Sequence, residues 1–317
     1  MRILITGSSG QIGTNLALHL MEQGHDVLGI DKRPNAWTSK IPSLVHDLRE
    51  PILELPTVGA EVGDIDVVVH LAANAKVHDL VTEPRRALDN ITSTFNVLDF
   101  CRHHGLPIIF SSSREVYGDI HRYITDEPHA NFAFTESPYS ASKIAGEALT
   151  YSYARCYNLP YIVFRFSNVY GRFDNDLDRM ERVLPLFISK IANGEPITIF
   201  GKDKVLDFTY VDDCVAGITR AIELLAEGSP GRHTINLAYG QGNTLTRAAE
   251  LIAESLGVTP DIHYDATRPG EVKRYIANIS YAREILGYDP AVPLDEGIPR
   301  AVEWSKSWSG VPVADRD

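Results

Sequence analysis

The chain has 317 residues, 44% of them hydrophobic, and its formal net charge at pH 7 is −12. It is long enough to bury a substantial core, and its acidity excludes nucleic acid or an anionic membrane surface as the main partner, because both require a basic footprint. No stretch resembles a signal peptide or an apolar span of about 20 residues, so we expect a cytoplasmic protein.

The three cysteines, Cys101, Cys156 and Cys214, lie far apart in the sequence. None belongs to a Cys-x-x-Cys pair, which argues against both a disulfide framework and a thiolate metal site. We expect them to be core residues, and we predict no metal.

Apolar and helical segments alternate along the first half of the chain. Residues 2–6 form an apolar run that leads through a glycine-rich turn into a helical pattern over 11–25 and a second apolar run at 26–31, which together predict a βαβ unit. Strands that are apolar throughout and alternate with helices predict a parallel sheet covered on both faces. Further apolar runs occupy 65–73, 106–113 and 159–169, and further helical patterns occupy 92–105 and 140–158.

This rhythm weakens after residue 167. A charged stretch precedes a short αβ section at 183–201, and residues 208–228 have the pattern of a helix that returns to the first domain. Short helical patterns at 246–257 and 280–290 indicate a smaller second lobe. We therefore predict a first domain of residues 1–167 with 206–231, and a second lobe of residues 168–205 with 232–317.

The sequence "TGSSGQIG" places Gly7, Gly10 and Gly13 directly after the first predicted strand and at the start of the first helix. Glycines there permit a tight turn and let a pyrophosphate lie at a helix N-terminus. Asp31 ends the second predicted strand, where a carboxylate accepts hydrogen bonds from ribose hydroxyls and repels a 2′-phosphate. The combination predicts an NAD site and favours NAD over NADP, although two basic residues follow Asp31. A tight βα turn with a surface aspartate is the structural alternative.

The predicted NAD site includes residues from several later segments. Asp47 in "HDL" is a candidate adenine contact, with a surface carboxylate as the equal alternative. The other residues that we expect to line the site are Gln11, Ile12, Leu48, Leu71, Ala72, Ala73, Tyr139 and Lys143.

In "YSASK", Tyr139 and Lys143 are four residues apart at the start of a helical run, so they share one face of the helix. A nearby ammonium and a positive nicotinamide ring both favour the phenolate, which lowers the pKa of the phenol towards the range of a useful base. A Tyr-x-x-x-Lys pair is common on amphipathic helices. It gains meaning here from the serines that end the preceding strand and from the glycine-rich turn.

The motifs "TGSSGQIG", "HLAA", "SSSREVYG", "YSASK" and "RFSNVYG" resemble the extended short-chain dehydrogenase/reductase family, specifically its nucleotide-sugar epimerases and dehydratases, over almost the whole chain. The resemblance implies an α/β fold, with a doubly wound parallel Rossmann sheet and a smaller C-terminal α/β lobe that binds the substrate. It also implies a homodimer that pairs through the helices holding "TSTFNVLDF" and "SASKIAGEAL".

The resemblance assigns the catalytic residues to Ser113, Tyr139 and Lys143. Asn168 in "RFSNVYG" matches a position that contacts substrate, and Arg268 in "RPGEV" resembles an arginine that grips the diphosphate. Leu206 departs from the pattern, because the family often has a second phosphate-binding arginine directly before "DF".

The implied mechanism begins at C4 of the sugar. The Tyr139 phenolate takes the proton of the 4-hydroxyl, hydride moves from C4 to NAD, and Ser113 hydrogen-bonds the developing carbonyl. A 4-epimerase returns hydride to the other face and needs no further acid or base. This reading gives an isomerase that acts on UDP-glucose, UDP-galactose or UDP-glucuronate.

Two alternative reactions depend on the residues after Ser113. A 4,6-dehydratase needs an Asp-Glu pair there, but Arg114 stays charged and cannot act as a general acid. Glu115 keeps a glucuronate decarboxylase open, with a structural Glu115–Arg114 salt bridge as the alternative. We favour epimerisation, with Ser112, Ser113, Arg114 and Glu115 all contacting substrate.

Three arginines in the charged stretch, Arg172, Arg179 and Arg182, are candidate ligands for a glucuronate carboxylate. They are interleaved with acidic residues, so a solvated face is the alternative. An NADPH-linked sugar reductase and a non-enzymatic NAD-sensing protein are the remaining alternatives. The second is disfavoured because Ser113, Tyr139 and Lys143 are all present.

Overall fold

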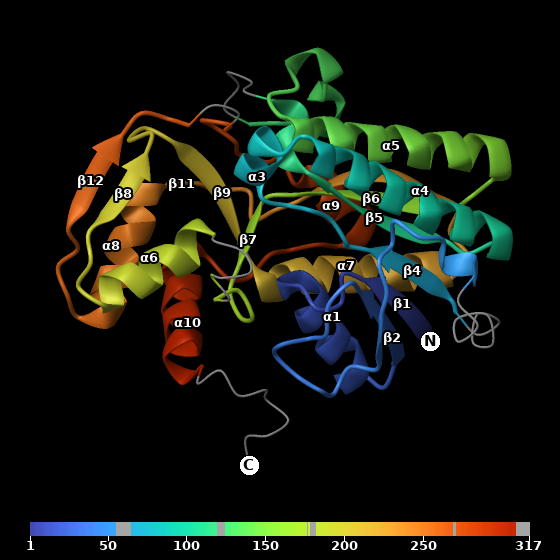
Figure 1. The fold of residues 1–317 in the computed structure, drawn as a ribbon, viewed down its shortest axis with the longest axis horizontal. Coiled ribbons are helices and arrows are strands. Elements are labelled where there is room, and N and C mark those ends of the chain that lie inside the picture. Colours follow the sequence, from blue (N-terminus) through green and yellow to red (C-terminus); the bar gives the residue numbers. More distant parts are fainter. Residues whose placement is uncertain (55–64, 119–123, 176, 178–181, 269–270, 309–317) are drawn as a thin grey trace.

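The computed structural model describes residues 1–54, 65–118, 124–175, 177, 182–268 and 271–308. Figure 1 shows two units side by side. The large unit is built around a seven-stranded sheet, and the smaller unit holds two short sheets.

All seven strands of the large sheet run parallel, in the order β10-β6-β5-β4-β1-β2-β3. The strand order reverses beside β1, and ligands of open α/β sheets bind at the carboxyl ends of the strands at such a point. The strands are apolar because helices bury both faces. Their bounds are β1 (Arg2–Thr6), β2 (Asp26–Asp31), β3 (Ser43–Val45), β4 (Val67–His70), β5 (Ile108–Ser113), β6 (Tyr161–Phe166) and β10 (Gly231–Leu237).

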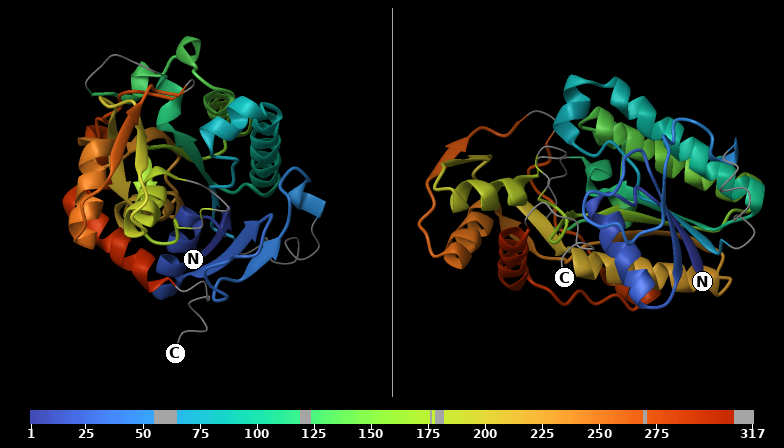
Figure 2. Two further views of the ribbon diagram at one scale, coloured as in Figure 1. Left: turned by 60° about the vertical axis from the view of Figure 1, so that its left-hand side comes forward. Right: turned by 60° about the horizontal axis from the view of Figure 1, so that its bottom comes forward.

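Helices cover both faces of this sheet (Figures 1 and 2). On one face α4 packs against α5, and on the other α1 packs against α7. The α4 helix ends at Gly105, whose φ of 68° is left-handed and suits glycine. The helices of the large unit are α1 (Gln11–Glu22), α3 (Val77–Thr82), α4 (Arg85–His104), α5 (Pro138–Tyr157), α7 (Val211–Ala226) and α9 (Ser280–Leu286).

The smaller unit contains a β11-β9-β7 sheet and a parallel β12-β8 pair. A continuous core joins the two units, since buried Ile3 and Phe164 of the large sheet belong to the same apolar cluster as Ile252 and Ile298 of the smaller unit. Its elements are β7 (Asn168–Tyr170), α6 (Val183–Ala192), β8 (Ile197–Phe200), β9 (Val205–Tyr210), β11 (Gly242–Thr244), α8 (Leu245–Leu256), β12 (Ile262–Asp265) and α10 (Leu294–Ser307).

The doubly wound parallel sheet with a smaller α/β lobe is confirmed, but several local expectations need correction. Residues 208–210 end strand β9 and are not helical, because α7 begins only at Val211. The predicted boundary at 231/232 is also displaced. Strand β10 pairs with β6, which places residues 232–237 in the large sheet. Strand β9 belongs to a sheet of the smaller unit, although residues 206–231 were predicted for the first domain. Helix α9, predicted for the second lobe, packs against β10 and α7 of the large unit. The division of the rest of the chain into domains stays a prediction.

Candidate active site

A cavity of about 1110 Å³ lies at the carboxyl ends of the large sheet and continues towards the smaller unit. Strand ends supply one wall, and elements of the smaller unit supply the other. The wall includes Gly7, Asp31, Leu71, Ser113 and Phe166 from the strand ends, and Phe187, Phe200, Leu206 and Arg268 from the smaller unit.

The glycine-rich turn after β1 is packed so closely that side chains do not fit. Gly7 has a φ of +75°, and a Cβ atom at Gly13 would lie 2.2 Å from the Gly7 carbonyl oxygen. Gly10 precedes α1 without a side-chain cap, and Gly10, Gln11 and Ile12 line the cavity. The first N–H groups of a 12-residue helix therefore open towards the cavity. This arrangement fits the pyrophosphate of a dinucleotide.

Asp31 is the last residue of β2 and is 8% exposed in the cavity wall. Its carboxylate accepts hydrogen bonds from the backbone N–H groups of Ser9 and Arg33, each at 3.1 Å. These bonds hold the carboxylate beside the glycine-rich turn. The position fits a ribose diol next to the pyrophosphate.

The structure brings all the predicted NAD-site residues to this one cavity. Asp47 forms a 2.6 Å ion pair with Arg49, whose hydrogen bond lowers the pKa of the Asp47 carboxyl below its usual value. Adenine recognition by Asp47 stays a prediction. The cavity is lined by Gly7, Gly10, Gln11, Ile12, Gly13, Asp31, Asp47, Leu48, Leu71, Ala72, Ala73, Tyr139 and Lys143.

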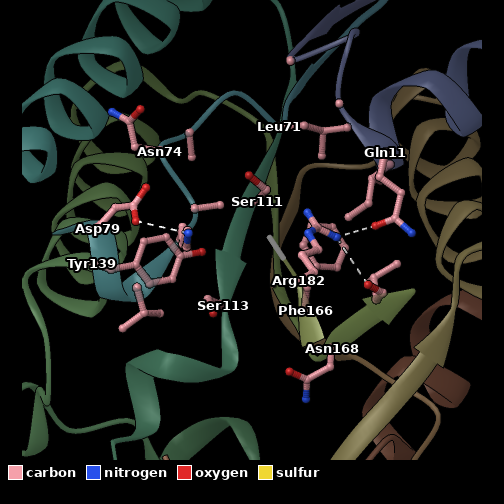
Figure 3. A pocket seen from close by; sticks show the side chains of 18 of the residues that line it. Gln11, Leu71, Asn74, Asp79, Ser111, Ser113, Tyr139, Phe166, Asn168 and Arg182 are labelled. Carbon is pink, nitrogen blue, oxygen red and sulfur yellow. Dashed lines mark hydrogen bonds and ion pairs between the residues drawn. The ribbon is translucent and has the colours of Figure 1, made fainter. Parts of the chain in front are cut away.

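Capping at Ser137 places Tyr139 in the first turn of α5. The Ser137 hydroxyl accepts a hydrogen bond from the Ser140 N–H group at 3.2 Å, and Pro138 begins the helix. Tyr139 is thereby placed beside the end of β5, where Ser113 also lines the cavity. Figure 3 shows Tyr139 and Ser113 together on one side of the cavity.

Two further residues on the following turns of α5 bind the two serines that precede Ser113 in β5. Lys143 Nζ donates to the Ser111 carbonyl oxygen at 2.7 Å, and the Ser112 hydroxyl donates to Glu147 Oε1 at 2.5 Å. Glu147 also receives two hydrogen bonds from the Arg165 guanidinium, at 2.8 and 2.7 Å. The Ser112 hydroxyl is therefore occupied by its hydrogen bond to Glu147 of α5, whereas Ser113 faces Tyr139.

Burial changes the acidity of both α5 groups. It raises the pKa of Tyr139 to about 12, while the Ser113 hydrogen bond opposes the change. Burial also lowers the pKa of Lys143 to about 8, against the nearby Glu147 charge. The expected lowering of the Tyr139 pKa is therefore not found within the protein alone, because desolvation outweighs the charges around the phenol.

Arg114 and Glu115 follow Ser113 in the 3₁₀ turn Arg114–Tyr117, and both line the cavity. Arg114 Nη2 lies 2.9 Å from Glu115 Oε1, and the side chains are 12% and 6% exposed. The Glu115–Arg114 salt bridge, which the sequence left open as the alternative to a catalytic Glu115, is therefore present. Burial raises the pKa of Glu115, and the Arg114 charge opposes this rise.

Arg182 lies in the cavity wall opposite Tyr139 (Figure 3) and joins the glycine-rich turn to the smaller unit. It donates to Gln11 Oε1 and lies 3.2 Å from Asp174 Oδ1. Burial raises the pKa of Asp174 to about 7. Arg182 is therefore already paired, which leaves its predicted contact with a sugar carboxylate without support. Arg179 lies outside the described residues.

The far end of the cavity carries two more cations. Arg268 Cζ lies 3.8 Å from the centre of the Phe200 ring, and Lys204 Nζ forms a 2.6 Å ion pair with Glu271. Leu206 of β9 and Lys204, which directly precedes the strand, both line the cavity. Asn168 also lines the cavity, with its amide donating to the Asp207 carbonyl oxygen at 2.9 Å.

Among the residues of this wall or of its immediate support that sequence reasoning missed are Glu147, Asp174, Lys204 and Glu271. Helical spacing from Lys143 indicates Glu147, and a spacing of two from Leu206 indicates Lys204. Glu271 had no local signal, because its partner Lys204 is distant in sequence. In the described part of the chain, no helix has the length and apolarity to cross a bilayer. No cluster of three or more His, Cys, Asp or Glu residues there could bind a metal ion.

Solved structures resemble this arrangement closely. The UDP-glucose 4-epimerase of Thermotoga maritima, solved with UDP-glucose, superimposes with a TM-score of 0.88 at 29% identity, covering 96% of this chain and 99% of that one. The UDP-glucuronic acid 4-epimerase of Bacillus cereus, solved with UDP-glucuronic acid and NAD, gives a TM-score of 0.85 at 27% identity and covers 96% and 99%.

Sequence comparison agrees. A putative UDP-glucose 4-epimerase of Methanocaldococcus jannaschii is 32% identical over 313 residues, which cover 96% of this chain and 98% of the relative. The sequence model of the NAD dependent epimerase/dehydratase family matches residues 3–238. The family resemblance and the NAD cofactor inferred from the sequence are thereby confirmed. The chain belongs to the NAD dependent epimerase/dehydratase family.

Proposed function

We propose that the protein is a nucleotide-sugar 4-epimerase that inverts C4 of a UDP-hexose with tightly bound NAD. The observation that carries this is the arrangement at the end of β5. Ser113 and Tyr139 lie together in the cavity wall, and the adjacent Arg114 is held in an ion pair with Glu115. Epimerisation needs only the first pair, whereas elimination of water needs an additional acid that Arg114 cannot supply.

The proposed roles follow from the contacts. Tyr139 takes the proton of the sugar 4-hydroxyl, and Ser113 hydrogen-bonds the same oxygen. Lys143 has two contributions, because it fixes the strand end through the Ser111 carbonyl and its charge favours the phenolate. NAD held by the glycine-rich turn and Asp31 would supply a reversible hydride acceptor for C4, so that the overall reaction would involve no net redox change.

The residues that would hold each part of the ligands follow from the same cavity. The glycine-rich turn and the start of α1 fit the pyrophosphate, and Asp31 fits the ribose diol. Arg268 is the proposed cation for the substrate diphosphate, and Asn168 a proposed sugar contact. Leu206 occupies the position where the family often has a second phosphate-binding arginine, so that position supplies no second cation for the diphosphate.

The test is to incubate the NAD-loaded protein with UDP-glucose and identify the product by chromatography and mass spectrometry. We expect UDP-galactose of unchanged mass, equilibration from either sugar and no accumulation of NADH. A 4-keto-6-deoxy sugar would show a dehydratase, and release of CO₂ from UDP-glucuronate would show a decarboxylase. Net consumption of NADPH would show a reductase, and binding without turnover of any sugar would show a sensor.

We further propose that the enzyme is a homodimer that pairs through α4 and α5. These helices pack side by side on one face of the large sheet (Figure 1), and α4 exposes Leu88 and Phe95 at 60% and 46%. Gel filtration should give a dimer at micromolar concentration, and Phe95→Glu should give a monomer. A monomeric wild-type protein would contradict the proposal. The cytoplasmic location stays a prediction.

A further inference from the structure

The Arg114–Glu115 pair is a buried, charge-neutral feature of the cavity wall. The two side chains are 12% and 6% exposed, and their charges lie 2.9 Å apart. Arg114 is also supported by Tyr275, since its Cζ atom lies 6.0 Å from the centre of that ring. The pair is thus fixed in place from behind, while both residues line the cavity.

Each member of the pair has one buried polar atom without a hydrogen-bond partner. These atoms are Arg114 Nη1, a donor, and Glu115 Oε2, an acceptor. A buried polar atom that stays unpaired costs about 1–3 kcal/mol, and more when it is charged. Both atoms are buried, so the charges of Arg114 and Glu115 are compensated chiefly by each other.

The pair also lies beside the reacting position. The Glu115 N–H group donates to Ser113 Oγ at 3.2 Å, and the charges of both Glu115 and Arg114 act on the Tyr139 phenol. Tyr139 is the proposed base for the 4-hydroxyl. Groups next to it must therefore contact the substituents next to C4, which are the 3-hydroxyl and the C5 substituent.

The cations around this part of the cavity are already engaged. Arg114 pairs with Glu115, Arg182 with Asp174, and Lys204 with Glu271 at 2.6 Å. Lys143 donates to a backbone carbonyl. Among the described residues of the substrate half of the cavity, Arg268 is left for the diphosphate. A carboxylate at C5 would then meet Glu115 with no cation of its own, and two buried like charges repel strongly.

We infer that Arg114 and Glu115 form a specificity element that accepts a neutral hexose and rejects a hexuronate. This rests on the proposed 4-epimerase function and names its substrate class as UDP-hexoses with an uncharged C5 substituent. The carboxylate of Glu115 is the discriminating group, because it neutralises Arg114 and repels the uronate.

Binding and turnover test the inference separately. Calorimetry on the NAD-loaded protein should give a Kd for UDP-glucose at least about 10-fold below that for UDP-glucuronate, and kcat/KM should follow the same order. Equal affinities, or tighter binding of UDP-glucuronate, would overturn the specificity element whatever reaction the protein catalyses. If UDP-glucose binds more tightly but no 4-epimer forms, the specificity element stands and the proposed function fails.

Variants assign the discrimination to the pair. Glu115→Gln keeps the shape and releases the Arg114 charge, so kcat/KM for UDP-glucuronate should rise about 10-fold while that for UDP-glucose falls. The double variant Arg114→Gln, Glu115→Gln has no free cation at this position. It should therefore not show the rise in kcat/KM for UDP-glucuronate that is expected for Glu115→Gln alone. Glu136→Gln changes an exposed carboxylate just before α5 that is absent from the cavity wall, and should leave the ratio unchanged.

The result that would exclude Glu115 as the discriminating group is an equal loss of kcat/KM for both sugars in folded Glu115→Gln. The same change of ratio in Glu136→Gln would show that net charge, rather than the pair, decides the preference. If Glu115→Gln fails to fold, the two wild-type Kd values still test the inference, because they need no variant.

Discussion

Tyr139, Lys143 and Glu147 occupy successive turns of α5, and each faces a different serine at the end of β5. The pattern "YSASK" is sufficient to predict that Tyr139 and Lys143 share a helix face. It does not reveal the raised pKa of the phenol, because that depends on burial by residues far away in sequence. For the same reason the pairings of Arg182 and Lys204 could not be predicted from the chain alone.

The Tyr139→Phe variant should lose about 10²–10⁴-fold in kcat, because it removes the proposed C4 base with little change in volume. Turnover of UDP-glucose by the NAD-loaded variant measures this. Tyr157→Phe, the same change in the last turn of α5, is the matched control and should retain full activity. If folded Tyr139→Phe works within a few-fold of wild type, the phenol is not the base.

The pH dependence should report Lys143, whose pKa is lowered to about 8 by burial. The ammonium is present below that pKa and is lost as the pH rises through it, so its support for the phenolate disappears on the alkaline side. We expect kcat at saturating UDP-glucose to fall above about pH 8, while circular dichroism shows the fold intact. A kcat that is constant up to pH 10 would contradict a role for the ammonium charge.

Cofactor choice should depend on Asp31, because its carboxylate suits a free ribose diol and repels a 2′-phosphate. Wild-type protein should bind NAD much more tightly than NADP, and Asp31→Ala should narrow the gap. Asp26→Ala, at the exposed start of the same strand, should leave the difference between the affinities for NAD and NADP unchanged. The assignment fails if the unmodified protein binds the two cofactors equally, as measured by fluorescence titration.

At the scale of elements, the alternation of apolar runs and helical patterns predicts β1, β2, β4, β5 and β6 of the large parallel sheet. It misses β3, which has only three residues. It also fails at β9 and β10, where the chain crosses between the units. The last three residues of β9, "FTY", lead directly into α7, so no turn residue marks the boundary between the strand and the helix. Helix α10 was not predicted either, because "LDEGIPRAVEWSKS" contains an internal proline.

Asp207 in β9 ties these late elements together. Its buried carboxylate accepts hydrogen bonds from the backbone N–H groups of Tyr239, Gly240 and Ala277, at 3.2, 3.0 and 3.2 Å. Asp207→Asn places an amide donor against these donors and should lower the free energy of unfolding by at least about 2 kcal/mol in urea denaturation. Asp212→Asn removes an exposed ion pair with Arg172 and should cost less than about 1 kcal/mol. Equal effects of the two changes would show that Asp207 does not join the elements.

At the scale of the whole molecule, the cavity combines a cofactor half at the carboxyl ends of the large sheet with a substrate half contributed by the smaller unit. The described residues that the sequence assigned to either half line this cavity, except Arg172, which forms an exposed ion pair with Asp212. Their individual roles stay predictions, but their convergence follows from the fold, since parallel strands present all their carboxyl ends at one edge. The continuous core between the units keeps the two halves in fixed register.

The central claim is that only the C4 hydride and the proton of the 4-hydroxyl move, while Glu115 takes no part in proton transfer at C5. The most direct test is to run the reaction of UDP-glucose in D₂O and analyse the product by mass spectrometry and NMR. We predict a C4 epimer of unchanged mass with no deuterium at C5. Deuterium at C5, with loss of water and dependence on Glu115, would contradict the claim and identify a dehydratase instead.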